Sequence, residues 1–233
     1  MNDKINELKN RLKLLKPDDY VSKNYDSLVN IDQIEQIIRQ IEGENLKKLL
    51  KQCRPGTKEW KKFQDFCFSL VQLTLEKNEF CECKTRSELV AKYVPQGIKG
   101  LRKDIIIPLI PKQFNTKDDV KNIWDEFRNE PWNCSYLVFD AKNYKNGITH
   151  TQIYQMFHYL NKRNGKIGII FTRQHSIDKS GKAALIRIRD DNYMVFVLND
   201  KDIEKWIDTY IEQGNIRVFF RDLKTQFDHS SIV

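Results

Sequence analysis

Two apolar runs in the middle of this chain carry charged residues, and this combination restricts the fold more than any other feature. The first run reads LRKDIIIPLI and contains Asp104, and the second reads SYLVFDAKNY and contains Asp140 and Lys142. Both runs are rich in the β-branched and aromatic residues of buried strands. Burying a charged side chain costs free energy unless the charge is paired or binds a metal ion. We therefore expect these three side chains to pair with one another or to hold a metal.

The spacing of the second motif predicts a specific chemistry. Residues i and i+2 of a strand point to the same face, so Asp140 and Lys142 should project together, with Phe139 and Ala141 on the other face. Asp104 reaches the same place if the two strands are neighbours. Two carboxylates and the backbone carbonyl of Ala141 are the hard oxygen ligands that Mg²⁺ prefers, and Mn²⁺ can replace it. Lys142 would hold or activate a water molecule or neutralise negative charge on a phosphate, as in a metal-dependent phosphodiesterase.

The same residues also allow a purely structural interpretation. Asp140 and Lys142 could neutralise each other at the end of the sheet, and Asp104 could pair with Arg102 or Lys103. An acid-x-lysine triplet is common by chance, so its surroundings carry the argument. Here the triplet closes an apolar strand, a second acid lies on another apolar strand, and a polar helix follows at once.

The charge of the chain favours an anionic partner. The net charge is +8 and the isoelectric point is near 9.1, as expected for a protein that binds nucleic acid, although a lysine-rich surface alone would give the same values. Contacts from such residues to phosphate give affinity without sequence choice. The basic residues gather in four stretches, the third of which flanks Asp104: Lys47, Lys48 and Lys51; Lys58, Lys61 and Lys62; Lys99, Arg102 and Lys103; Lys162, Arg163 and Lys166.

The cysteines and the termini predict a cytoplasmic protein. No secretion signal is recognisable in the charged N-terminal stretch, and no apolar run is long enough to span a membrane. Cys81 and Cys83 form a C-x-C pair without further ligands at the spacing of a metal site. We expect reduced thiols and no cysteine-bound metal.

The first 54 residues are predicted to form a helical segment, followed by an α/β domain over residues 55–233. Helical periodicity predicts one helix over residues 5–15, a second from Ile31 to a stop or bend at Gly43 with Asn30 as its N-cap, and a short third helix before Pro55–Gly56. Such short helices are not stable alone. They must pack on the main domain, on each other, or on a second copy in a homodimer.

The rest of the chain alternates between helical and strand patterns. A helix is expected from Thr57 with Trp60, Phe63 and Cys67 facing inward. The alternation predicts an α/β sheet covered on both faces. The further predicted elements are a strand near residues 80–86, the two apolar strands, a helix within 118–130 that presents Val120 and stops at Pro131, helices over 149–163 and 180–191, strands over 166–173 and 194–199, a helix over 200–213 closed by Gly214, and a final strand or short helix.

These motifs resemble the PD-(D/E)XK nuclease superfamily, whose fold is called restriction-endonuclease-like. RKDIIIP matches the first acid, VFDAKNY matches the acid-x-lysine, and THTQIYQMFHYL matches the helix after the catalytic strand, over about residues 55–210. The resemblance implies a mixed central sheet flanked by helices and metal-dependent hydrolysis of DNA, or less often of RNA. It also implies that Asp104 and Asp140 bind the metal and that Lys142 is the catalytic lysine.

The chain departs from this family at two positions. Asp140 stands where the family usually has glutamate. Many members carry a glutamate on the first core helix, where this chain has Gln64, so Glu59 or Asp65 would have to substitute as the third acid. These departures leave open a weakened or inactive site.

The helix after the acid-x-lysine motif offers further candidates for contacts with nucleic acid. Gln155 and Tyr159 have the Q-x-x-x-Y spacing of RecB-type nucleases and lie on one helical face. Gln152, one turn earlier, is an equally good candidate, and a polar helix face with Tyr159 in the core is the structural alternative. Asn143 and Lys145 follow the catalytic lysine and are expected to contact phosphate or to order the loop.

Three functions follow from these patterns. The first is a Mg²⁺-dependent DNA endonuclease in restriction or anti-phage defence, acting alone, as a homodimer or with a partner protein of the defence system. The second is an inactive nuclease fold that binds nucleic acid or serves in assembly. The third is an interaction protein with helical arms and structural charges. Neither a Gly-rich phosphate loop nor a G-x-S-x-G elbow is present, so nothing favours an ATPase or a serine hydrolase.

Overall fold

The structure is a computed structural model in which six stretches of the chain are described. These are residues 25–75, 91–95, 102–109, 123–160, 165–173 and 177–229. Side chains are described for these stretches except at residues 25–32, 57, 91–95, 102–104 and 108.

Helices and strands alternate along the second half of the chain, as predicted. In chain order the elements are α2 (Tyr25–Gln52), the short 3-10 helix η2 (Thr57–Glu59), α3 (Trp60–Thr74), β1 (Ala91–Pro95), β2 (Arg102–Pro108), α6 (Ile123–Arg128), β3 (Tyr136–Lys142), α7 (His150–Tyr159), β4 (Ile167–Thr172), α8 (Lys179–Asp190), β5 (Met194–Leu198), α9 (Asp200–Gln213) and α10 (Arg217–His229).

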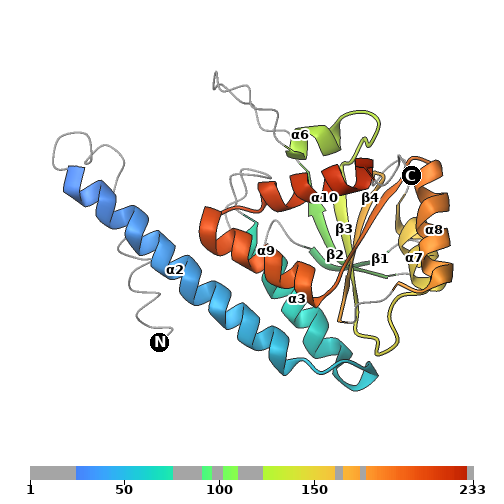
Figure 1. Cartoon of the computed structure of the whole chain (residues 1–233), viewed down its shortest axis with the longest axis horizontal. Coiled ribbons are helices and arrows are strands. Elements are labelled where there is room, and N and C mark those ends of the chain that lie inside the picture. The colour runs from blue at the N-terminus through green and yellow to red at the C-terminus, as the bar shows by residue number, and fades with distance from the viewer. Residues whose placement is uncertain are drawn as a thin grey trace.

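The strands form one mixed sheet in the order β1-β2-β3-β4-β5. The first three strands are antiparallel neighbours, and β3, β4 and β5 run parallel. Helices α7 and α8 make the crossovers that parallel strands require (Figure 1). The predicted α/β architecture, a mixed sheet flanked by helices, is confirmed.

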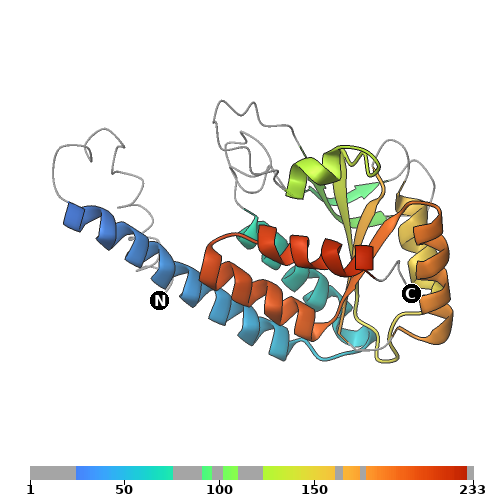
Figure 2. The same ribbon diagram turned by 45° about the horizontal axis from the view of Figure 1, so that its top comes forward.

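Helices cover the two faces of the sheet unequally. Figures 1 and 2 show α7 and α8 on one side, and α3, α9 and α10 on the other with α2 lying across them. Alternation along the strands sends Ile105, Phe139 and Ile169 into the larger core beneath α3 and α9. Ile106 and Val138 enter the smaller core beneath α7 and α8. Within the described ranges, no helix has the length and apolar character needed to cross a membrane.

Local signals in the sequence fix the ends of several helices. Thr149 caps α7 and Asn199 caps α9, each in a reciprocal capping box. Gly214 ends α9 with φ of 71°, the left-handed conformation that glycine adopts without steric cost. The C-terminal stop predicted at Gly214 is therefore correct.

The helical segment differs from the prediction. One continuous helix of 28 residues, α2, replaces the two short helices expected after Ile31, and it begins at Tyr25, so Asn30 is not its N-cap. Gly43 neither stops nor bends the helix. A Cβ atom at Gly43 would lie 2.4 Å from Ile211 Cγ1, so glycine lets α2 approach α9 closely.

The α2 helix is joined to the main core at its C-terminal end. Leu46, Leu50 and Cys53 belong to the same buried cluster as the inward face of α3. The predicted boundary at Pro55–Gly56 lies in the turn between α2 and α3, and the core continues across it. The helix predicted over residues 5–15 lies outside the described residues.

One other prediction is corrected. Trp60 was expected to face inward, but its side chain is 54 % exposed because the first turn of α3 extends past the core that buries Phe63. For the segment after Gly214, where the sequence left a strand or a short helix open, the structure shows a helix of 13 residues, α10. The strand predicted near residues 80–86 and the inward-facing Val120 lie outside the described residues.

Candidate active site

The antiparallel pairing of β2 and β3 places the start of β2 beside the end of β3, the two strand ends that carry the predicted acids. Strand β2 pairs with β3 so that Ile105 lies opposite Phe139 and Ile106 opposite Val138. Continued by one step, the same antiparallel register would place position 104 opposite Asp140. Alternation places both positions on the sheet face that Ile106 and Val138 share. The side chains of Arg102, Lys103 and Asp104 lie outside the described residues.

Asp140 and Lys142 form a buried ion pair. Lys142 Nζ lies 2.8 Å from Asp140 Oδ2, and the exposed fractions of the two side chains are 11 % and 2 %. Ala141 packs against the core on the opposite face together with Phe139. The two charged side chains therefore project together, as the i, i+2 spacing predicts.

Helix α7 extends this ion pair into a chain of hydrogen bonds. Lys142 Nζ donates to Gln155 Oε1 at 3.0 Å, and Gln155 Nε2 donates to the hydroxyl of Tyr159 at 2.8 Å. Tyr159 is itself buried in the smaller core. Gln155 and Tyr159 thus hold the Lys142 ammonium group in place beside Asp140. Tyr159 is also buried in the core, as the structural interpretation of this helix face expected.

The surroundings of Lys142 keep it protonated. Burial is the largest influence and lowers its pKa, but the charge of Asp140 and the hydrogen bond to it together outweigh burial, with smaller contributions from Tyr144 and Tyr159. The net effect raises the pKa of Lys142 above its ordinary value. Lys142 is therefore an ammonium ion near neutral pH, suited to neutralising negative charge.

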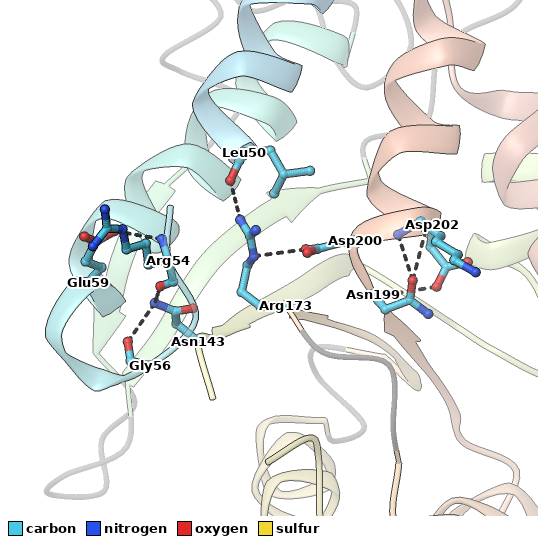
Figure 3. A network of polar contacts seen from close by, with 10 residues as sticks. Leu50, Arg54, Gly56, Glu59, Asn143, Arg173, Asn199, Asp200 and Asp202 are labelled. Atoms are coloured by element: carbon cyan, nitrogen blue, oxygen red, sulfur yellow. Dashed lines mark hydrogen bonds and ion pairs between the residues drawn. The ribbon is translucent and has the colours of Figure 1, made fainter. Parts of the chain in front are cut away.

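Asn143 orders a loop at the end of β3. Its side-chain amide donates to the carbonyls of Arg54 at 3.1 Å and Gly56 at 2.8 Å, and the Gly56 amide donates to the Asn143 carbonyl at 3.1 Å (Figure 3). Asn143 is buried. Of the two roles predicted for it, phosphate contact and loop ordering, the structure shows the second.

Lys145 follows Asn143 in the same loop and also lies against Gly56, but its side chain is exposed. A Cβ atom at Gly56, whose φ is 125°, would lie 3.1 Å from Lys145 Cε, so the lysine stem packs over the glycine. This leaves the Lys145 ammonium group at the surface next to the turn between α2 and α3, where it can contact phosphate.

The side chain of Gln152 takes part in the capping box at the start of α7. Its Oε1 accepts hydrogen bonds from the Thr149 amide at 2.9 Å and from the Thr149 hydroxyl at 2.8 Å. Of the two glutamines, Gln155 accepts a hydrogen bond from Lys142 and Gln152 accepts from Thr149, while the contacts of either residue with nucleic acid stay a prediction.

The three candidates for a third acid lie in the helix layer on the other side of the sheet. Glu59 accepts a hydrogen bond from the Arg54 amide at 2.8 Å and so stabilises the turn before α3. Gln64 is buried on α3 and Asp65 is half-buried. Of the three, Glu59 is connected to the end of β3, through the loop that Asn143 holds (Figure 3).

Thr172 is a candidate site residue that the sequence alone did not single out. The parallel register of β3 and β4 aligns Thr172 with Lys142, on the same face of the sheet. Thr172 is 1 % exposed, and its hydroxyl has no hydrogen-bond partner among the described residues. Buried hydroxyls normally have a partner, so this oxygen is available to a group bound beside Lys142. A threonine ending the run IGIIFT gives no signal that would single it out.

Arg173 holds the helices around this edge of the sheet. It follows β4 directly and is buried, its Nη1 donates to the Leu50 carbonyl at the end of α2, and its Nε lies 3.0 Å from Asp200 Oδ1 at the start of α9 (Figure 3). Its guanidinium also lies over the Phe63 ring, with 5.6 Å to the ring centroid. These contacts hold α2 and α9 at the edge where β3 and β4 end.

The described side chains that offer oxygen atoms on this face are the carboxylate of Asp140 and the hydroxyl of Thr172. A divalent cation here would also need the carboxylate of Asp104. No group of three or more acidic, histidine or cysteine side chains that could hold a metal occurs among the described side chains, which do not include that of Asp104. With Asp104, the donor set of two carboxylates and a carbonyl suits Mg²⁺.

The comparisons with known proteins give no family for the chain. No family model, no curated protein and no solved structure matches it.

Proposed function

We propose that this chain is a Mg²⁺-dependent nuclease of the PD-(D/E)XK type that hydrolyses phosphodiester bonds of DNA. The observation that carries the proposal is the meeting of three features on one sheet face. These are the β2–β3 register, which continued by one step would pair positions 104 and 140, the Asp140–Lys142 pair, and the hydrogen bonds from Lys142 to Gln155 and on to Tyr159. The mixed sheet flanked by helices, with a helix directly after the D-x-K strand, agrees with a restriction-endonuclease-like fold.

Each residue has a role that follows from its place. Asp104, Asp140 and the Ala141 carbonyl would hold Mg²⁺, which when bound polarises the scissile phosphate and lowers the pKa of a water molecule. Lys142 neutralises the negative charge that develops on the phosphate. Gln155 fixes the position of the Lys142 ammonium group, and Tyr159 fixes Gln155. Arg102 and Lys103 flank the first acid in sequence and would attract the phosphate backbone.

The biological setting rests on the resemblance alone. We infer an endonuclease that prefers DNA to RNA and works in the cytoplasm in restriction or anti-phage defence. A double-strand cut at one site would require two active sites and therefore a homodimer or a partner protein of the defence system.

A catalytically inactive nuclease fold is the second candidate, and one specific observation favours it. Gln64 occupies the helix position where many family members have glutamate, and it is buried. Such a protein would bind nucleic acid or serve in assembly without cutting.

Cleavage of a circular plasmid in Mg²⁺ or Mn²⁺ distinguishes the two candidates. The wild-type protein and Lys182→Ala, an exposed lysine on α8, should nick or linearise the plasmid. Lys142→Ala and Asp140→Asn, like the wild type in EDTA, should lose cleavage by a factor of at least about 100. Equal activity in wild type and Lys142→Ala would disprove the proposal. Plasmid binding without cleavage in either metal would support the inactive candidate.

A further inference from the structure

An exposed tryptophan marks a surface that the active site does not include. Trp60 is the first residue of α3 and is 54 % exposed, although tryptophan is usually largely buried. Its neighbours Lys58, Lys61 and Lys62 are exposed as well. An aromatic ring at the surface among lysines combines a flat apolar face with positive charge.

The turn between α2 and α3, which leads to Trp60, is rich in positive charge. From Lys47 to Lys62 the chain carries seven lysines and arginines against one acid, Glu59. The carboxylate of Glu59 accepts a hydrogen bond from the Arg54 backbone, and Lys62 donates to the Gln52 carbonyl at 2.9 Å. We call this surface the α2–α3 corner. Its exposed residues are Lys48, Lys51, Arg54, Lys58, Trp60, Lys61 and Lys62.

The α2–α3 corner is fastened to the strand that carries the catalytic lysine. Asn143, next to Lys142 in sequence, donates to the carbonyls of Arg54 and Gly56 and accepts from the Gly56 amide (Figure 3). Lys145 packs over Gly56 and adds another exposed ammonium group. A chain of phosphates lying along the corner would therefore lead to the end of β3.

We propose that the α2–α3 corner binds a single-stranded segment of nucleic acid beside the active site, with a base stacked on Trp60 and phosphates on the surrounding lysines. The inference rests on the proposed function for its choice of nucleic acid as ligand. Stacking on a side chain needs a base with a free face, which an unpaired strand offers and a duplex interior does not. Lysine contacts with the backbone add affinity that falls with salt.

Binding in EDTA tests the inference separately from cleavage. The probe is a fluorescently labelled oligothymidylate, and anisotropy is measured over a series of salt concentrations. Trp60→Ala should weaken binding about tenfold or more, whereas Trp60→Phe, which keeps an aromatic ring, should retain most of the affinity. Lys61→Glu should lower the slope of log affinity against log salt by about 1.

Matched controls lie on α8. Ile186 is exposed to a similar extent as Trp60, at 51 %, and Lys182 is exposed like Lys61, so Ile186→Ala and Lys182→Glu should bind as the wild type does. Wild-type affinity in Trp60→Ala would overturn the inference, and so would a duplex of the same length that binds more tightly than the single strand. An absence of binding to either nucleic acid would overturn it as well, and would favour an acidic protein as the partner.

The two proposals fail in different ways. A wild type that binds the oligonucleotide through Trp60 but never cuts would contradict the nuclease and leave the corner intact. If the wild type cuts the plasmid and Trp60→Ala binds the oligonucleotide with unchanged affinity, the proposed binding at the α2–α3 corner is contradicted. The proposed nuclease activity is then unaffected.

Discussion

The buried hydroxyl of Thr172 offers a test of whether the face that carries Lys142 is a functional site or only a structural ion pair. It lies beside Lys142 in the β3–β4 register and lacks a hydrogen-bond partner among the described residues. An unpartnered buried hydroxyl costs about 1–3 kcal/mol, so Thr172→Val should leave the free energy of unfolding unchanged or raise it. If the hydroxyl binds the group that reacts beside Lys142, the same change should lower the rate of plasmid cleavage about tenfold.

Thr172→Ser provides the matched control because it keeps the hydroxyl. Serine at this position should retain most of the cleavage rate at slightly lower stability, since one buried methyl group is lost. Full cleavage activity in Thr172→Val would remove Thr172 from the site.

Cys134 predicts how stability depends on pH. Burial raises the pKa of this thiol from an ordinary value of 9.0 to about 11, against smaller opposing effects of hydrogen bonds from the Lys166 and Ile167 amides. A raised pKa stabilises the fold at low pH, and this contribution disappears as pH rises from the unfolded to the folded value. Between pH 9 and pH 11 the wild type should therefore lose about 2 kcal/mol more unfolding free energy than Cys134→Ala. Urea unfolding at both pH values measures this difference, and parallel losses in the two proteins would contradict it.

Local chemistry made part of the site predictable from sequence. Asp140 and Lys142 lie together because side-chain alternation within one strand needs no tertiary information. Asn143 and Gln152 were harder to assign, since an amide serves equally as a phosphate donor, a loop tether or a cap. The partners of Asn143 lie 89 and 87 residues away in sequence, which no local pattern reveals.

Helix α2 continues through Gly43 because this glycine lets the helix pack closely on α9. Glycine in a helix interior costs about 1 kcal/mol relative to alanine, which is why the sequence predicted a stop. In the structure the missing side chain admits Ile211, with Ile207 Cγ2 also within 3.3 Å of a Cβ position at Gly43. Tertiary packing on α9 thus outweighs the local propensity.

A double-mutant cycle tests this explanation. Gly43→Ala should lower the unfolding free energy by about 1 kcal/mol, because the cost of overpacking against Ile211 exceeds the gain in helix propensity. In an Ile211→Ala background the same change should raise the unfolding free energy by up to about 1 kcal/mol. Thermal or urea unfolding of the wild type, the two single variants and the double variant measures both effects. If Gly43→Ala stabilises the protein in both backgrounds, Gly43 does not determine how closely α2 approaches α9.

Other elements follow the sequence where the periodicity of apolar residues is clear. Helices α7 and α9 begin within one residue of their predicted starts, and strands β3, β4 and β5 are the predicted apolar runs. Predictions failed where the outcome depends on what a helix packs against. Trp60 has the spacing of a buried face, but α3 meets the sheet only from Phe63 onward. The sequence left a strand or a short helix open for the tail, and burial of Phe219 and Phe220 against α9 and α6 favours the helix, α10.

For the whole molecule, the fold collects its polar connections where β3 and β4 end. Asn143 holds the α2–α3 turn at the end of β3, while Arg173 holds the end of α2 and the start of α9 at the end of β4 (Figure 3). Ligand sites in α/β sheets commonly lie outside the carboxyl ends of such strands. The mixed sheet was predictable from alternating patterns, but this edge was not, because it joins residues from four separate parts of the chain.

The proposed nuclease requires a cation shared by Asp104 and Asp140. Titration calorimetry with Mn²⁺ measures this directly in the wild type, Asp104→Asn, Asp140→Asn and the control Asp191→Asn, an exposed position after α8. We expect one Mn²⁺ to bind per chain in the wild type and in Asp191→Asn, and none in Asp104→Asn or Asp140→Asn. Lys142→Ala should still bind the ion. Absence of binding in the wild type, or full binding in Asp140→Asn, would contradict a metal centre on this face and leave Asp140 and Lys142 as a structural ion pair.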